Sequence, residues 1–156
     1  MSEATQDNKL AIFNMDKIYV KDLSLEIPHA PKIFTGRDNP QVDVQLHTQA
    51  SSVEEGLFEV VVMATVTAKI GEKIMFLIEV KQAGIFQIRN VPTEELEPIL
   101  AVMCPNILFP YLREVVSELA VRGGFAPVLL NPINFDAIYQ QQKQQQLQAA
   151  TPIVTH

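Results

Sequence analysis

Residues 57–70 read LFEVVVMATVTAKI, and residues 74–82 read IMFLIEVKQ after a glycine turn at Gly71. In the first run every second residue from Phe58 to Ile70 is apolar, the period-two pattern of a β-strand. The connection between the runs is far shorter than the dozen or so residues that a parallel crossover requires. The two runs therefore predict an antiparallel hairpin.

Two segments before this hairpin alternate in the same way. Gln41–Gln49 alternates apolar with polar residues, and so does the end of Lys17–Ile27. In the latter, one parity carries apolar residues and the other polar ones: Leu23, Leu25 and Ile27 against Asp22, Ser24 and Glu26. The chain up to Ile88 therefore predicts four β-strands.

After Val91 the apolar spacing becomes helical. Thr93 is expected to cap a first helix that Pro98 and Pro105 keep short or kinked. A second helix ends at Gly123-Gly124, and Asn134 is expected to cap a third. The second has apolar residues at spacings of three and four: Leu108, Tyr111, Leu112, Val115, Val116 and Leu119. Strands followed by helices predict an α+β fold, a four-stranded antiparallel sheet with helices packed on one face.

The length of 156 residues is sufficient for one domain with its own core. We expect residues 1–12 to be a flexible N-terminal segment and residues 13–139 to be the folded domain. Residues 140–156 form a glutamine-rich C-terminal tail, in which seven of the nine residues from Gln140 to Gln148 are glutamine. This tail is expected to be partly helical and then disordered.

Composition excludes several classes of function. A net charge of −6 argues against nucleic acid binding and against docking on anionic membranes. The polar, acidic start lacks the features of a signal peptide, and charges or prolines interrupt the apolar runs before the ~20 residues of a membrane span. A single cysteine, Cys104, suits a reducing compartment. We therefore expect a cytoplasmic location and no membrane insertion.

Residues with catalytic or metal-binding chemistry are scattered. His29, His47, His156 and Cys104 form no cluster with ligand spacing, so no metal site is predicted. The sequence contains neither GxxxxGK[ST] nor GxGxxG, so no phosphate-binding loop is indicated. We expect no catalytic residue and no cofactor, although a small-ligand-binding α+β domain stays open as an alternative.

Surface character is more informative. Asp22 and Glu26 share one face of the first predicted strand, and Leu77 and Glu79 share one face of the fourth. An acidic sheet face of this kind either attracts a basic partner or is simply solvated. The long loop Pro28–Pro40, with its apolar pair Ile33-Phe34, is either a flap over a groove or a plug on the core. The sheet is apolar on both faces and few helices are available to cover it, which favours self-association.

Several long, proline-punctuated runs stand out: residues 18–31, IYVKDLSLEIPHAP; 79–86, EVKQAGIF; 104–114, CPNILFPYLRE; and 131–137, NPINFDA. Together these runs resemble the SecB family of bacterial protein-export chaperones. The resemblance covers about Phe13 to Tyr139. It departs from the family at Leu112, where alanine is usual, at the longer Gly124–Pro127 spacing, and before Pro40, where a tryptophan is absent.

This resemblance implies an ATP-independent chaperone that assembles as a dimer of dimers, a homotetramer. Such a chaperone holds unfolded precursor proteins and delivers them to SecA, the translocation ATPase, whose basic, zinc-bearing tail is the docking element. The family's residues carry over to three sets here. The SecA docking face is Asp22, Glu26, Leu77 and Glu79; the assembly positions are Phe76, Ile78, Val80 and Gln82; the client groove is placed near Leu25, Ile27, Ile33, Phe34, Phe86 and Leu108. A chaperone of the same fold that serves another system, such as a toxin–antitoxin pair, is a second alternative.

Overall fold

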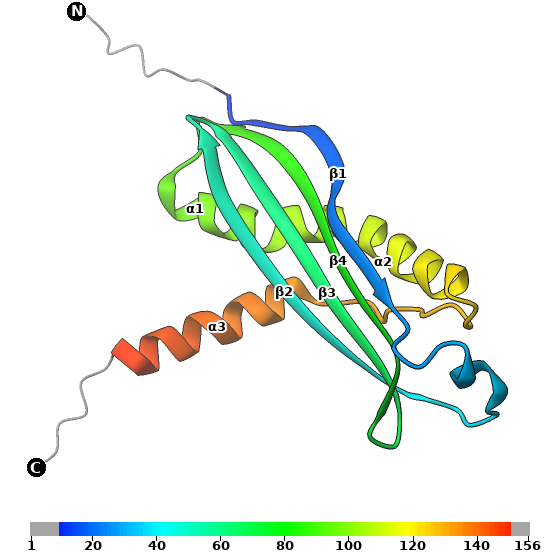
Figure 1. The fold of residues 1–156 in the computed structure, drawn as a ribbon. Coiled ribbons are helices and arrows are strands. Elements are labelled where there is room, and N and C mark those ends of the chain that lie inside the picture. Colours follow the sequence, from blue (N-terminus) through cyan, green and yellow to red (C-terminus); the bar gives the residue numbers. More distant parts are fainter. Residues whose placement is uncertain (1–9, 151–156) are drawn as a thin grey trace, which may run out of the picture.

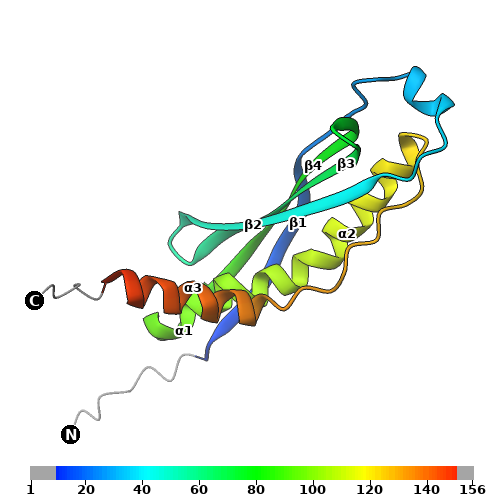
Figure 2. The ribbon, with the colours of Figure 1, turned by 90° about the horizontal axis from the view of Figure 1, so that it is seen from below.

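A computed structural model describes residues 10–150 and consists of one antiparallel sheet with helices on one side of it (Figures 1 and 2). The strand order is β1-β4-β3-β2. The strands are β1 (Ile12–Glu26), β2 (Gln41–Glu54), β3 (Leu57–Ile70) and β4 (Lys73–Arg89). The helices are α1 (Thr93–Pro98), α2 (Cys104–Arg122) and α3 (Phe135–Ala150). The predicted α+β fold is confirmed.

The strands are mostly longer than their patterns predicted. β3 begins and ends at the predicted residues, whereas β1 begins at Ile12 and β4 continues through Gly84 to Arg89. The glutamine-rich residues 140–150 are helical and complete α3, which leads away from the sheet (Figure 1). Most of the proposed segment 1–12, and residues 151–156 of the tail, lie outside the described residues.

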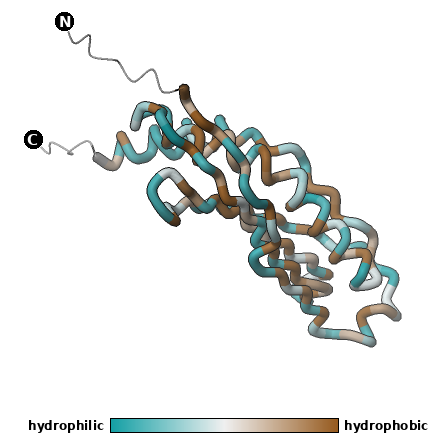
Figure 3. Tube along the Cα trace, turned by 90° about the horizontal axis from the view of Figure 1, so that it is seen from above, coloured by the Kyte–Doolittle hydropathy of each residue, from teal (hydrophilic) through white to brown (hydrophobic). Residues whose placement is uncertain are grey.

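Residue parity separates the two faces of the sheet. From Phe76 onward in β4, and along β3, even-numbered residues point toward the helices and form the core, whereas odd-numbered residues point to the face that we call the open face. The short-range alternation of hydrophobic and hydrophilic residues is visible along the trace in Figure 3. The sheet contributes to the core Val60, Val62, Ala64, Val66, Phe76, Ile78, Val80 and Phe86.

α1 and α2 are joined without a break by a π-helical turn, Ile99–Met103. In this turn the amide of Cys104 bonds to the carbonyl of Ile99, five residues back. The next residue, Pro105, has no amide hydrogen to donate, and a widened turn accommodates such a defect without ending the helix. The short first helix is confirmed, but it is continuous with the second.

Of the two predicted N-terminal helix caps, Asn134 and Thr93, only Asn134 is confirmed. Asn134 caps α3, since its Oδ1 accepts a hydrogen bond of 3.0 Å from the amide of Ala137. The predicted cap at Thr93 is wrong, because α1 begins at Thr93 itself and Pro92 occupies the cap position without a side-chain hydrogen bond.

The continuous helical stretch Thr93–Arg122 is long and apolar enough, at 30 residues, to match the length and composition of a membrane span. The prolines and charges that interrupt the apolar runs in the sequence do not divide the helix, since it continues through Pro98 and Pro105. Here the stretch packs as a core helix: its buried stripe, which includes Leu108, Leu112 and Val116, lies against β3 and β4.

Gly84 sets how closely α2 approaches β4. A Cβ atom on Gly84 would lie 2.9 Å from Phe86 Cε2 and 3.0 Å from Leu108 Cδ2, both in fully buried side chains. We predict that Gly84→Ala lowers the free energy of unfolding by about 1–3 kcal/mol through overpacking. Urea unfolding measures this change.

Gly36→Ala is the matched control, since a Cβ there meets only the Ile33 carbonyl oxygen at 3.9 Å. We expect it to change stability by less than about 0.5 kcal/mol. Equal effects of the two substitutions would contradict the close contact between α2 and β4.

Candidate functional site

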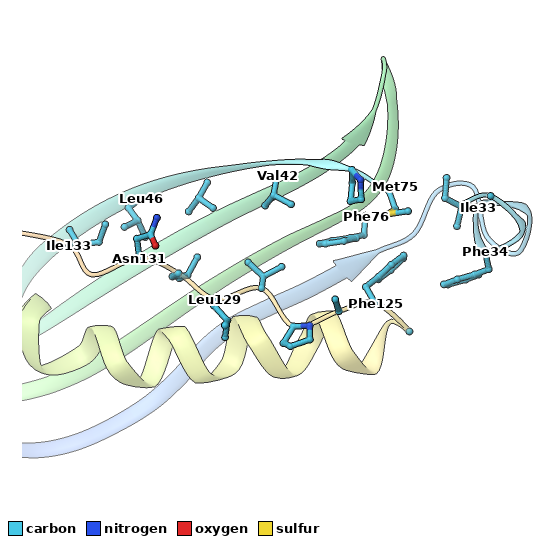
Figure 4. Close-up of a pocket in the computed structure, with 18 of the residues that line it drawn as sticks. Ile33, Phe34, Val42, Leu46, Met75, Phe76, Phe125, Leu129, Asn131 and Ile133 are labelled. Carbon is cyan, nitrogen blue, oxygen red and sulfur yellow. The ribbon is translucent and has the colours of Figure 1, made fainter. Parts of the chain in front are cut away.

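A large apolar groove lies between β2 and the extended segment that connects α2 to α3 (Figure 4). We call that segment, residues 123–134, the strap. The groove has a volume of about 970 Å³. Its lining side chains come from the loop, β2, β4, the strap and α3, and include Ile33, Phe34, Val42, Val44, Leu46, Met75, Phe76, Phe125, Val128, Leu129, Leu130, Asn131, Ile133 and Ile138.

Three aromatic rings close one end of this groove. The Phe34 ring stacks on Phe125 with centroids 5.3 Å apart, and Phe125 packs on Phe76 at 4.5 Å. Gly124 has φ +88°, and a Cβ there would come within 3.2 Å of the Phe34 ring, so glycine suits both the backbone and the contact. Phe34 is still 49% exposed, so its ring offers apolar surface to a ligand.

The loop Pro28–Pro40 is thus both a plug and a flap. Ile33 is buried, while Phe34 faces the groove, and both line it as placed from the sequence. Leu25 and Ile27 are half-buried against the core beside the groove and do not line it. Phe86 and Leu108 do not line it either: both are fully buried where α2 crosses β4, so their placement at the groove is corrected.

Sequence reasoning missed half of the groove. Nothing in the sequence pattern places the strap at a groove, yet it supplies Phe125, Val128 and Leu129. The signal that could have identified it is composition, because FAPVLL is unusually apolar for a connection between two helices. β2 supplies Val42, Val44 and Leu46, the apolar parity that the sequence did reveal.

The open face carries the four residues assigned to docking. Across the β1–β4 pair, Glu26 is opposite Leu77 and Ser24 is opposite Glu79, and Asp22, two pairs further along, is opposite Lys81. We call Asp22, Glu26, Leu77 and Glu79 the acidic patch. Among the described residues, none of its three carboxylates forms an ion pair. The patch is therefore an unneutralised negative surface around one half-buried leucine.

A β-bulge gives β1 its orientation next to this patch. Val20 pairs with Gln82 and Asp22 pairs with Lys81, so Lys21 is the extra residue. Lys21 Nζ donates a hydrogen bond of 2.7 Å to Glu59 Oε1 on β3, and the Tyr19 hydroxyl donates to Glu59 Oε2. Both side chains reach across β4 over Ala83, which is fully buried beneath them.

These bonds shift two pKa values in opposite directions. The hydrogen bonds from Lys21 and Tyr19 lower the pKa of Glu59 below its ordinary value of 4.5. Burial, together with the bond to Glu59, raises the pKa of Tyr19 to about 12. Tyr19 therefore stays a donor and Glu59 a charged acceptor at neutral pH.

The four assembly positions lie inside the subunit. Phe76, Ile78, Val80 and Gln82 point toward the helices and are almost completely buried in the single chain. They do not present a surface to a second copy directly, which corrects their placement at an interface. Large exposed apolar side chains occur instead on β1 and on the outer side of the continuous helical stretch Thr93–Arg122: Met15, Val20, Leu23, Met103, Tyr111 and Val121.

Metal-binding and nucleophilic groups do not gather in the described part of the chain. No group of three or more His, Cys, Asp or Glu residues there has the arrangement of a metal site. Cys104 is buried, and burial raises the pKa of its thiol to about 12, which keeps it protonated.

The Glu59 cluster predicts a pH dependence of stability. Because the pKa of Glu59 is lowered in the folded state, its charge stabilises the fold above the ordinary pKa. That contribution disappears as pH falls through the folded-state pKa. We predict that the wild-type protein loses more stability from about pH 5 to pH 3 than Glu59→Gln does, measured by urea unfolding. Glu55→Gln, in the β2–β3 turn, is the control, and an acid response of Glu59→Gln equal to wild type would refute the assignment.

Known proteins similar to this chain agree with the fold. The family model described as "Preprotein translocase subunit SecB" matches residues 5–146. A protein-export protein SecB of Methylobacillus flagellatus is 57% identical over 147 residues, 94% of each chain. The Chromobacterium violaceum relative of the same name is 58% identical over 137 residues, covering 88% of this chain and 91% of its own.

A solved structure is similar at lower identity. It is a SecB-like chaperone of Mycobacterium tuberculosis in complex with a ChAD peptide from an antitoxin. It has a TM-score of 0.64 and 19% identity, and covers 78% of this chain and 90% of its own. The sequence resemblance is thus confirmed by the family model and by relatives along nearly the whole chain: this chain belongs to the SecB family of protein-export chaperones.

Proposed function

We propose that this protein is a cytoplasmic, ATP-independent chaperone that holds unfolded precursor proteins in its groove and delivers them to SecA. The observation that carries the proposal is the groove itself, an elongated apolar furrow along β2. Burial of apolar area is non-directional and contributes about 25 cal/mol per Å², so such a furrow accepts side chains of many shapes.

The edge of β2 adds a second, sequence-independent means of binding. β2 pairs only with β3, so the backbone groups along its other side are unpaired within the sheet. An extended chain can add to such an edge as a further strand while alternate side chains enter the groove. A folded protein has few free strands to offer, so this mode favours unfolded clients.

A small-molecule site is the weaker explanation of the same cavity. Such sites combine apolar walls with several convergent polar groups that fix the orientation of the ligand. Among the side chains that line this groove, Asn131 is the single polar one. The lining therefore favours a groove that binds polypeptide segments of many different sequences over a small-molecule site.

The acidic patch supports SecA docking. Its three carboxylates have no ion partner in the described chain, and a basic segment would neutralise them around Leu77. The patch lies on the open face, whereas the groove lies on the helix side. SecA would thus dock without competing directly for the groove.

Self-association into a homotetramer is supported by exposed apolar surface. Leu23 and Val20 on β1, with Tyr111 on α2, are each at least 40% exposed in the single chain. Soluble monomers seldom leave a patch of this kind in water. Several linked grooves would raise avidity for one long client by roughly 10²–10⁴. In this arrangement Phe76 and Ile78 would influence assembly through the seating of α2.

Between the two chaperone systems, the relatives favour export. The chain is 57–58% identical to proteins named for protein export, but 19% identical to the chaperone solved with an antitoxin peptide. No step of the proposed cycle requires hydrolysis, because binding alone withdraws the unfolded chain from folding and aggregation.

Phe34 offers a direct test of client binding. We predict that Phe34→Ser weakens the affinity for a precursor diluted from urea about fivefold, because half of an aromatic ring is lost from the groove. Titration by fluorescence gives the affinity. Light scattering on the same samples should give four times the subunit mass of 17.4 kDa, and a larger mass with precursor.

Val53→Ser is the matched control, since Val53 is 54% exposed on β2 but does not line the groove. We expect it to leave client affinity unchanged. Equal losses in both variants would argue against the groove, and a monomeric mass would argue against the tetramer.

Glu79 offers the corresponding test of docking. We predict that Glu79→Lys weakens SecA binding about tenfold and leaves precursor binding unchanged, because the charge reversal falls on the open face only. Calorimetric titration with SecA measures the first and fluorescence the second. Glu55→Lys makes the same charge change in the β2–β3 turn; if it weakened SecA binding as much as Glu79→Lys, the acidic patch would not be the docking site.

A further inference from the structure

A small pit in the open face lies beside the acidic patch. It has a volume of about 110 Å³. Val61, which is 8% exposed, and Met63 contribute its apolar part, and the remaining lining residues are Lys21, His47, Gln49 and Lys81. All four of these can donate a hydrogen bond, and no carboxylate lines the pit. Its chemistry therefore suits an anionic group.

The register places the pit and the patch in contact. Lys81 on β4 is opposite Asp22 of β1 on one side and opposite Met63 of β3 on the other. Met63 in turn is opposite His47 of β2. One row across the sheet therefore leads from the edge of the acidic patch directly into the pit, and a segment docked on the patch reaches the pit within one residue row.

The two lysines of the pit differ in their partners. Lys21 is already neutralised by Glu59 at 2.7 Å. Lys81 is exposed and has no ion pair with any described residue, although Asp22 lies opposite it in the sheet. Lys81 is thus the free cation at the boundary between the negative patch and the pit.

We propose that this pit binds a side-chain carboxylate of the protein that docks on the acidic patch, with Lys81 as the residue that recognises it. The inference rests on the proposed docking of SecA. It makes the docked segment bipolar: basic residues lie over Asp22, Glu26 and Glu79, and an aspartate or glutamate follows at Lys81. A basic residue at that place would be repelled, so Lys81 fixes the register and direction of the segment.

The sign of one charge change tests this proposal. If the docked segment were basic throughout, replacing Lys81 by glutamate would enlarge the acidic patch and strengthen binding. If a carboxylate occupies the pit, the same replacement creates a repulsion at close range and weakens binding. The two arrangements of charge therefore predict opposite effects.

The experiment is calorimetric titration of SecA into the full-length wild-type protein, Lys81→Gln, Lys81→Glu and Lys17→Glu. Lys17 lies on the same face of β1, opposite Ile85 and outside the pit, so it reports the long-range effect of an added negative charge. We expect affinity to fall about threefold for Lys81→Gln and about tenfold for Lys81→Glu. Lys17→Glu should bind at least as tightly as wild type.

Glu79→Lys in the same series separates the inference from docking itself. If Glu79→Lys weakens binding while Lys81→Glu strengthens it or leaves it unchanged, the carboxylate in the pit is wrong and docking stands. If wild-type protein does not bind SecA, or Glu79→Lys has no effect, docking and the pit fail together. Unfolding curves of each variant confirm that the sheet is intact.

Discussion

One helix has to cover one face of a sheet that is wider than the helix. A helix with its side chains is about 10 Å across, whereas the axes of the outer strands in a four-stranded sheet are about 14 Å apart. α2 lies over the central strands β4 and β3 and makes few contacts with β1. The helix-side residues of the outer strands are left without its cover. On β2 this uncovered strip becomes the groove, and on β1 it becomes exposed apolar surface.

The bulge in β1 determines which of that strand's side chains face the helices and which lie on the open face. Strand side chains alternate strictly, so one inserted residue moves everything beyond it to the other face. Here the insertion at Lys21 keeps Ile18 and Leu25 on the helix side and puts both Tyr19 and Asp22 on the open face. Gln82 supports the bulge from the helix side, where its Nε2 donates to the Tyr19 carbonyl at 3.1 Å, and Glu59 supports it from the open face. Without the bulge, Asp22 and Glu26 would point to the helix side, and Leu23 and Leu25 would point to the open face.

The fold and the acidic patch were predictable because both depend on local period. Alternation in residues 57–70 defined β3 to the residue, and parity alone placed Asp22 with Glu26 and Leu77 with Glu79. Features that depend on contacts between distant segments were not. Phe86 and Leu108 have the character of groove residues, but Gly84 lets α2 approach so closely that both are sealed in the core. The strap has no period at all, so its position against β2 could not be derived from the sequence.

The location of the two surfaces on opposite faces has a mechanistic consequence. Under the proposed function, a client in the groove would contact the helix side of β2, whereas a docked partner would contact the open side of β1 and β4. Neither would block the other, so the chaperone could hold its client while it is being recognised. The sheet between them is a continuous ladder with a packed interior, and such a layer transmits displacement poorly unless it has two discrete arrangements. Transfer by proximity would therefore require less of this structure than transfer by a conformational signal. In the proposed cycle, a docked ATPase would compete for a client whose individual groove contacts are weak, and the partner would capture each contact as it is released.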